Sequence, residues 1–396
     1  MVGERSARLA AALCVAALTA ACTGDGSPTP GPSSPTVPPS PVPAQVKVAY
    51  LEDLSAEGAA LRVAPAFQGA KLAFDTAGLS GDLPVQVQLV GLDTEGDAAT
   101  ASEVARQIAE DPSYVAAIGA PYLGDQGALA GVLDPAGVPF VTLSGLDPGL
   151  AANGWMTWRR AVATQAQEAA ALAGYVDSLR PARDRVCLAR DGSRVGATFL
   201  KAVASSLAAH VLVRQRVLPT EESAAAFTDA VTASGCDMVV WGGFSAGAVA
   251  LERHLVGVGL AEVRFVGDGG IKDTTYLQVA DRAGDGTVAS CPCADLSTST
   301  EFAAQRFIQD YQADFGLPPG SYAAEAWDVA HMFLDAFRSG ATTRGDVLAF
   351  VEGMPPYEGL ANSYVFSRGG DLEPQAANVY LYEDEGGRWL PLSPAD

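Results

Sequence analysis

Short apolar or β-branched runs alternate with amphipathic helical patterns from residue 45 onward. The first series predicts strands at 46–51, 85–92, 115–119 and 138–143, separated by helices at 66–77, at 98–110 and from about 126. An apolar run of strand length followed by a helical period, repeated in this order, is typical of parallel strands joined by crossover helices. This part of the chain therefore predicts one parallel sheet covered by helices.

A second series of the same kind follows residues 155–162. It predicts strands at 185–189, 211–217, 238–241, 264–266 and 286–290, and helices at 165–179, 195–209, 224–234 and 246–256. Helices at 301–315, 322–337 and 346–352 come next, and two final strands at 364–367 and 378–382 are expected to be joined by the turn 368–371. The predicted fold class is α/β, with two Rossmann-like lobes whose parallel sheets are flanked by helices.

Loops that follow the carboxyl ends of parallel strands are where open α/β sheets bind ligands. Six such loops are predicted, at 52–57, 120–125, 144–148, 190–194, 242–246 and 268–273. If the two lobes face each other with these edges inward, all six loops line one cleft. Small-molecule sites concentrate in such clefts, and closure of the lobes buries the solute.

The N-terminus has the pattern of an export signal. Arg5 and Arg8 precede an apolar run, 9–21, that is too short to span a bilayer as a permanent helix. The run ends in small residues before Cys22, which resembles the lipobox of bacterial lipoproteins, although Thr19 stands where Leu is usual. We therefore predict a lipoprotein signal peptide at 1–21 and lipid attachment at Cys22, with an ordinary cleaved signal as the alternative.

Residues 22–44 are rich in Pro, Ser, Thr and Gly, a composition that does not form a packed core and is typical of an extended tether. The 46 acidic and 25 basic residues give the chain a net charge of −21. Such a field repels phosphate backbones, so we expect no nucleic-acid partner. We therefore predict that the protein lies outside the cytoplasm and is anchored to the cell membrane.

Four cysteines remain in the body, at positions 187, 236, 291 and 293. In an oxidising compartment they predict two disulfides, for which three pairings are possible. A bond between Cys187 and Cys236 is attractive because both lie in segments predicted as strands of one sheet, which leaves Cys291 bonded to Cys293 or free. A metal site is the alternative, but the spacing of Cys291 and Cys293 is too short for a zinc pair and no histidine is near.

With this order of elements, several short stretches match one family. They are VKVAY at 46–50, FQGAKLAF at 67–74, IGA at 118–120, GVPFVTLSGLDP at 137–148, GGF at 242–244, FVGDG at 265–269, YAAEAWDVA at 322–330 and RGGDL at 368–372. In order and spacing the chain resembles the type I periplasmic binding proteins of branched-chain amino acid ABC transporters. The resemblance covers about residues 46–389.

The resemblance implies a monomer whose lobes are joined by three hinge crossings, expected near 157–161, 289–294 and 354–357. The first lobe would comprise 45–158 and 292–354, and the second 159–291 and 355–396. It also implies reversible capture of a small polar, amino-acid-like solute and its delivery to an ABC permease in the membrane, without catalysis or cofactor. A ligand-sensing lipoprotein that does not serve transport is the alternative.

The family's ligand contacts fall on identifiable positions of this chain. They are Tyr122, Leu123, Ser144, Gly145, Leu146, Val195, Phe244, Ser245, Asp268 and Tyr322. Leu123 and Leu146 stand where the family carries hydroxyl side chains for the ligand's carboxylate, and Asp268 is the acid available for an ammonium group. Because two carboxylate-binding hydroxyls are missing, the ligand need not be leucine or valine.

The stretch Gly243-Phe244-Ser245-Ala246-Gly247 also fits the Gly-x-Ser-x-Gly nucleophile elbow, between a predicted strand and a predicted helix. A serine hydrolase would need an acid and then a histidine on a loop near Ser245. Only His254 and His331 follow Ser245, and both fall within predicted helices. The hydrolase is therefore the weaker hypothesis, and we expect no catalytic residue.

Overall fold

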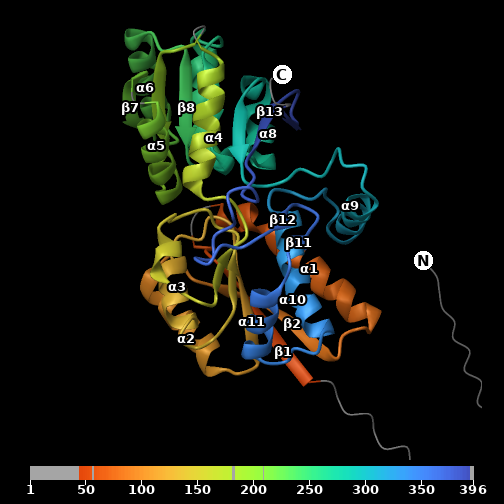
Figure 1. Cartoon of the computed structure of the whole chain (residues 1–396). Helices are drawn as coiled ribbons and strands as arrows, with labels where there is room; N and C mark the ends of the chain where they lie inside the picture. Colours follow the sequence, from red (N-terminus) through yellow and green to blue (C-terminus); the bar gives the residue numbers. More distant parts are fainter. Residues whose placement is uncertain (1–43, 56–57, 181–182, 208, 393–396) are drawn as a thin grey trace, which may run out of the picture. The chain divides into compact units, whose positions relative to one another are not determined.

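The computed structural model describes residues 44–55, 58–180, 183–207 and 209–392, and the structural statements below concern these residues. The predicted signal peptide, most of the tether and Cys22 lie outside this range. The α/β fold class is confirmed, since parallel strands alternate with helices and form two separate sheets (Figure 1). No helix of the described part has both the length and the apolar character needed to cross a membrane.

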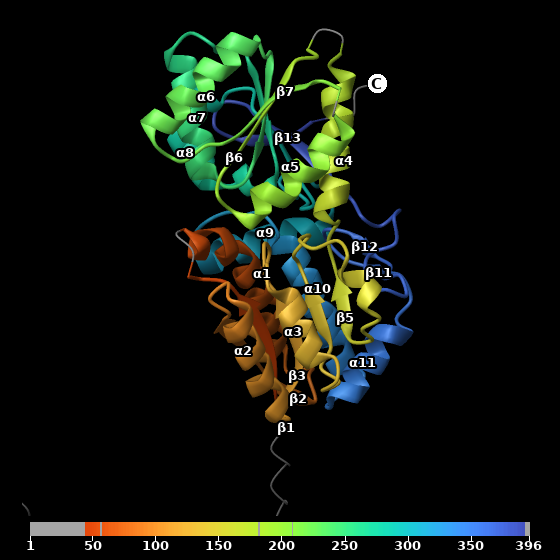
Figure 2. The same ribbon diagram turned by 90° about the vertical axis from the view of Figure 1, so that its left-hand side faces the viewer.

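The first sheet contains five parallel strands in the order β2-β1-β3-β4-β5. Its strands are β1 (Ala44–Glu52), β2 (Val85–Asp93), β3 (Tyr114–Gly119), β4 (Phe140–Thr142) and β5 (Trp158–Arg160). One face is covered by α1 (Ala59–Ser80), α10 (Ala323–Arg338) and α11 (Arg344–Gly353), and the other by α2 (Ala98–Glu110) and α3 (Gln126–Leu133) (Figure 2).

Both faces of the first sheet are apolar because both are covered. Val48 and Tyr50 point toward α1 and α10, whereas Ala49 and Leu51 pack against α2 and α3. All four are fully buried. This explains why β1 reads as a continuous apolar run rather than as an alternating one.

The second sheet has seven strands in the order β14-β13-β10-β9-β8-β6-β7. The parallel strands are β6 (Val186–Arg190), β7 (Val211–Arg216), β8 (Met238–Gly242), β9 (Arg264–Gly267) and β10 (Val288–Cys291), and β13 (Tyr380–Asp384) and β14 (Trp389–Pro391) add antiparallel pairs. Helices α4 (Gln165–Ser178) and α5 (Arg194–Ser206) cover one face, and α6 (Glu221–Ser234), α7 (Ser245–Gly257) and α8 (Thr274–Ala280) the other.

Within the described residues the chain passes between the two sheets three times. It leaves the first sheet after β5 and enters α4, which packs against β10. It leaves the second sheet after β10 and enters α9 (Phe302–Phe315), which packs against α1. After α11 it returns to β13, which pairs with β10.

The C-terminal strands differ from the prediction. The strands expected at 364–367 and 378–382 do not flank one turn as partners: β12 (Ser363–Tyr364) pairs with β11 (Tyr357–Glu358), and β13 pairs with β10 and β14. The turn at 368–371 instead closes a bridge between Phe366 and Leu372. Strands of two residues carry too little pattern to reveal their partners, and neither α8 nor β14 was expected, because each spans seven residues or fewer.

Two disulfides join the four cysteines of the body. Cys187 bonds to Cys236, as the sequence favoured, and Cys291 bonds to Cys293. Cys187 lies in β6, whereas Cys236 precedes β8 by two residues rather than lying in the strand. The first bond therefore ties neighbouring strands at the end of the sheet remote from the carboxyl-end loops.

A buried carboxyl group lies on the inner face of α7. Glu252 is 4% exposed and accepts hydrogen bonds from the hydroxyls of Tyr276 and Thr287. Burial raises the pKa of Glu252 to about 8, although the two hydroxyls oppose the shift. The folded protein therefore holds a proton at neutral pH that the unfolded chain releases.

We expect Glu252→Gln to change how stability depends on pH. Because the pKa is raised on folding, the free energy of unfolding of the natural protein falls as pH rises from about 4.5 through about 8. The neutral amide avoids this loss, so the variant should be more stable than the natural protein at pH 9, by a few kcal/mol at most, and nearly equal at pH 5. Urea unfolding at both pH values measures this difference. Glu222→Gln on the exposed side of α6 is the control and should not alter the slope.

Candidate ligand-binding site

Loops from the carboxyl ends of both sheets meet in direct contact. The hydroxyl of Tyr122, in the loop after β3, donates a hydrogen bond of 2.8 Å to the carbonyl of Gly269, in the loop after β9. Arg194, at the start of α5, forms an ion pair with Asp147, in the loop after β4. One guanidinium nitrogen of Arg194 lies 2.6 and 2.7 Å from the two carboxylate oxygens of Asp147. The two loop-bearing edges therefore face each other, as the cleft hypothesis requires.

Three aromatic side chains meet where these loops converge. Tyr122 packs edge-to-face on Phe244, at the start of α7, with ring centroids 5.5 Å apart, and on Tyr322, at the start of α10, at 5.7 Å. The guanidinium carbon of Arg62 lies 3.9 Å from the centre of the Phe244 ring. We call these three rings, Tyr122, Phe244 and Tyr322, the aromatic cluster. The face of its Phe244 ring thus contacts a cation, the guanidinium of Arg62.

The backbone that presents two of these rings is strained. Tyr122 has φ of 63° and Tyr322 has φ of 64°, in the left-handed region that non-glycine residues rarely adopt. Such a conformation costs about 1–3 kcal/mol and persists only where the surrounding structure imposes it. Strain of this kind is concentrated at binding sites, and here it falls on two residues that the sequence selected as ligand contacts.

Two buried carboxyl groups lie behind the aromatic cluster. Asp268 is 1% exposed and accepts hydrogen bonds of 3.1 Å from the backbone amides of Gly243 and Gly270. Glu168 accepts from the Gly269 amide at 2.8 Å and from the Ser290 hydroxyl. Burial raises the pKa of both groups, and the charge of Glu168 raises that of Asp268 further. A cation that enters this site would favour their ionised forms.

Two more carboxylates complete the acidic surroundings of the cluster. Asp191, after β6, accepts a 2.8 Å hydrogen bond from the amide of Phe244. Asp273 accepts one of 2.7 Å from the Ser245 hydroxyl. Burial raises the pKa of Asp273, while the charge of Arg62 opposes the shift. Four carboxyl groups and one guanidinium therefore surround the three rings.

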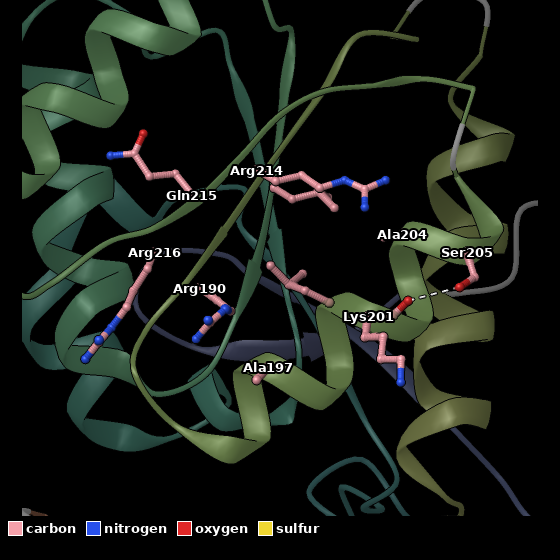
Figure 3. Close-up of a pocket in the computed structure, with 10 residues that line it drawn as sticks. Arg190, Ala197, Lys201, Ala204, Ser205, Arg214, Gln215 and Arg216 are labelled. Carbon is pink, nitrogen blue, oxygen red and sulfur yellow. Dashed lines mark hydrogen bonds between the residues drawn. The ribbon is translucent and has the colours of Figure 1, made fainter.

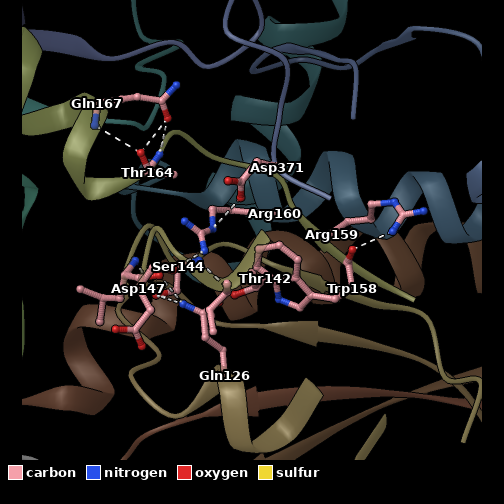
Figure 4. A network of polar contacts seen from close by, with 12 residues as sticks. Gln126, Thr142, Ser144, Asp147, Trp158, Arg159, Arg160, Thr164, Gln167 and Asp371 are labelled. Carbon is pink, nitrogen blue, oxygen red and sulfur yellow. Dashed lines mark hydrogen bonds and ion pairs between the residues drawn. The ribbon is translucent and has the colours of Figure 1, made fainter. Parts of the chain in front are cut away.

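The predicted contacts in the loop after β4 form an internal brace. The Ser144 hydroxyl donates a hydrogen bond to the Leu123 carbonyl at 2.9 Å, and the side-chain amide of Gln126 donates one to the Leu146 carbonyl at 2.7 Å. Figure 4 shows Ser144 and Gln126. The Leu123 and Leu146 side chains are 1% and 3% exposed, and Leu123 packs in the core of the first sheet. In this arrangement Leu123, Ser144 and Leu146 shape the loop, and their contact with a ligand stays a prediction.

Gly145 and Val195 link the two sheets through α4. The Gly145 carbonyl accepts a hydrogen bond from the amide of Gln165, whose side chain donates to the Val195 carbonyl at 3.0 Å. A Cβ at position 145 would lie 2.8 Å from the carbonyl oxygen of Ala163, so this approach requires glycine. The predicted site residues therefore include positioning groups as well as residues of the aromatic cluster.

The sequence did not single out the buried Arg160 at the end of β5. Its side chain is fully buried, donates to the carbonyl of Asp147 at 3.0 Å and lies 3.4 Å from the carboxylate of Asp371 (Figure 4). Arg160 thus links the segment in which the chain first passes between the two sheets, after β5, to the turn at 368–371. The other residues that were missed are Arg62, Glu168, Asp191 and Arg194. Arg194 and Asp191 fall inside the predicted loop 190–194, which was the available signal.

Ser245 has no histidine partner within the described residues. Its hydroxyl bonds to Asp273, while His254 lies nine residues further along the same helix, roughly 13 Å away by helical rise, and bonds to Glu221. His331 bonds to the carbonyl of Trp327. No group of three or more His, Cys, Asp or Glu side chains in the described part of the chain is placed to hold a metal ion.

We expect Ser245 to be unreactive toward a fluorophosphonate probe, because Asp273 without an imidazole does not make serine a nucleophile. The mass of the intact protein after incubation with the probe should not change. A mass increase that disappears in Ser245→Ala would contradict this expectation and support the hydrolase hypothesis.

Comparisons with known proteins agree with this geometry. The model of the family described as periplasmic binding protein matches residues 45–387. The Leu/Ile/Val-binding protein homolog 3 of Brucella melitensis is 23% identical over 324 residues, which cover 80% of this chain and 86% of that protein.

Solved structures share the fold at lower identity. The branched-chain amino acid transporter substrate-binding protein LivJ of Streptococcus pneumoniae, in complex with isoleucine, has a TM-score of 0.76 at 19% identity and covers 88% of this chain and 100% of that one. A solute-binding protein of an ABC transporter from R. palustris, in complex with benzoate, has a TM-score of 0.73 at 18% identity, with coverage of 88% and 96%. These matches confirm the resemblance, and the chain belongs to the periplasmic binding protein family, whose members work outside the cytoplasm.

Proposed function

We propose that this protein captures a small amino-acid-like solute with an ammonium group and delivers it to an ABC permease. The observation that carries the proposal is the aromatic cluster of Tyr122, Phe244 and Tyr322, which lies among carboxyl groups where loops of both sheets meet. Relatives named for leucine, isoleucine and valine support an amino-acid-like ligand.

Capture proceeds by closure of two lobes, the first comprising 45–158 and 292–354 and the second 159–291 and 355–396. The bond from Tyr122 to Gly269 and the ion pair of Arg194 with Asp147 join the two sheets, so they form only in the closed arrangement. A ligand that contacts both loop edges stabilises this arrangement over an open one. The permease would then recognise the closed form, which the bound ligand stabilises.

The chemistry of the aromatic cluster suggests how the ligand is oriented. Its ammonium group would lie against the face of Phe244, where Arg62 now places its guanidinium, and near Asp268. The Arg62 guanidinium would contact the ligand's carboxylate. This assignment offsets the absence of hydroxyl side chains at Leu123 and Leu146, because a guanidinium binds a carboxylate more strongly than a neutral hydroxyl does.

A ligand panel tests this proposal through Phe244. Amino acids, amides, short peptides and polyols are screened by thermal shift, and the best ligand at 100 times its Kd should add about 2.7 kcal/mol to the free energy of unfolding. Phe244→Leu keeps an apolar side chain but removes the aromatic face, so we expect affinity for an ammonium-bearing ligand to fall about 5- to 30-fold in calorimetry. Phe302→Leu, at a residue of α9 that is 83% exposed, is the matched control. Equal loss in both variants, or a ligand without a positive group as the best binder, would contradict the proposal.

We further propose that a lipid on Cys22 anchors the protein to the outer side of the cytoplasmic membrane. A diacylated cysteine binds a bilayer firmly, because each buried methylene contributes about 0.8 kcal/mol. The Pro-rich residues 23–44 would then hold the body away from the membrane surface.

We expect Cys22→Ala to move the protein from the membrane pellet to the soluble fraction of an expressing cell, as measured by immunoblot. Cys14→Ala, inside the predicted signal peptide, is the matched control and should leave the protein in the pellet. Retention of the Cys22→Ala protein in the pellet would show that another segment anchors it.

A further inference from the structure

A cavity of about 500 Å³ opens on the second sheet, and none of its lining residues belongs to the aromatic cluster. It lies between α5 and the end strand β7 (Figure 3). Its walls combine aliphatic side chains with basic ones. The lining includes Leu188, Arg190, Leu200, Lys201, Arg214 and Arg216.

The charge of this cavity is opposite to that of the protein. Three arginines and one lysine line it and no carboxylate does, although the chain has 46 acidic residues and a net charge of −21. Among the ion pairs of the described residues, none involves any of these four cations. A cluster of cations without acidic partners attracts an anion from solution.

The register of the sheet places Arg190, Arg214 and Arg216 on one face of two neighbouring strands. Arg190 in β6 lies directly beside Arg216 in β7, and Leu188 beside Arg214. Arg214 and Arg216 lie two residues apart and therefore share one face of β7. Like charges at facing positions of neighbouring strands are destabilising. A bound anion would relieve this repulsion.

Two buried leucines line the cavity beside the basic side chains. Leu188 and Leu200 are 1% and 7% exposed and lie between the basic side chains of β7 and α5. Arg190 is held in place by a hydrogen bond from its guanidinium to the Asp191 carbonyl at 2.8 Å. Guanidinium groups bind phosphate oxygens, and the leucines can pack against an apolar group. The arrangement therefore suits an anionic group carried on a short apolar stem.

We propose that this cavity is a second binding site, specific for a phosphate-type dianion on an apolar stem. It is separate from the site for the transported solute and does not depend on that assignment. The same chemistry occurs in a soluble phosphate ester and in the headgroup of an anionic phospholipid. The two sources are distinguished by the probes used.

The first experiment titrates the purified protein with phenyl phosphate in calorimetry at constant ionic strength. The double variant Arg214→Gln with Arg216→Gln should bind at least about tenfold more weakly, since each lost arginine removes a charge-assisted hydrogen bond. Arg253→Gln, at an exposed arginine of α7 outside the cavity, is the matched control and should bind as the natural protein does. Lys201→Gln, on α5, provides a second variant that leaves the strand unchanged.

The second experiment measures cosedimentation with vesicles of phosphatidylcholine and phosphatidylglycerol in a ratio of about 4:1, which gives about 20% anionic lipid. The full chain with Cys22→Ala is used, so that no lipid anchor contributes. The proposal is supported if the double variant and Lys201→Gln lose binding of phenyl phosphate or of the vesicles while Arg253→Gln keeps it. The probe that binds shows whether the natural ligand is a soluble phosphate ester or a lipid headgroup. Binding of neither probe, or equal weakening by Arg253→Gln, would overturn the proposal.

Discussion

Parallel strands all end at the same edge of their sheet, and in this protein the two edges lie against each other. The hydrogen bond from Tyr122 to Gly269 and the ion pair between Arg194 and Asp147 join loops that come from different sheets. Tyr122 and Phe244 of the aromatic cluster lie in such loops, whereas Tyr322 precedes α10, which follows the helix α9. The aromatic cluster therefore forms only while both sheets keep their parallel order and their facing edges.

The acidic groups behind the cluster follow from the same arrangement. Asp268 caps the short turn after β9 and accepts amides of two glycines, and Glu168 approaches it from α4. Burial raises the pKa of both groups, and the charge of Glu168 raises that of Asp268 further. A cation bound beside them would favour their ionised forms.

The two proposed sites differ in charge and in origin. The aromatic cluster joins two sheets and is surrounded by carboxylates, whereas the cavity at β7 belongs to one sheet and is lined by cations. The cationic cavity depends on the pairing of β6 with β7, which places Arg190 beside Arg216. A chain with a large excess of acid thus keeps a local surface of opposite sign, and the fold separates it from the acidic site.

The sequence by itself determined the fold class, because long alternating patterns of strand and helix have few compact solutions. It also indicated the strand-end loops, in which Tyr122, Phe244 and Asp268 lie, and the resemblance singled out Tyr322; contact of these residues with a ligand stays a prediction. Only the tertiary structure decided that Leu123 and Leu146 turn inward, that Arg62, Glu168 and Arg160 approach from distant segments, and that β12 and β13 take different partners. The physical reason is that side-chain direction in a loop and the pairing of two-residue strands depend on contacts between segments far apart in the chain, which no local period records.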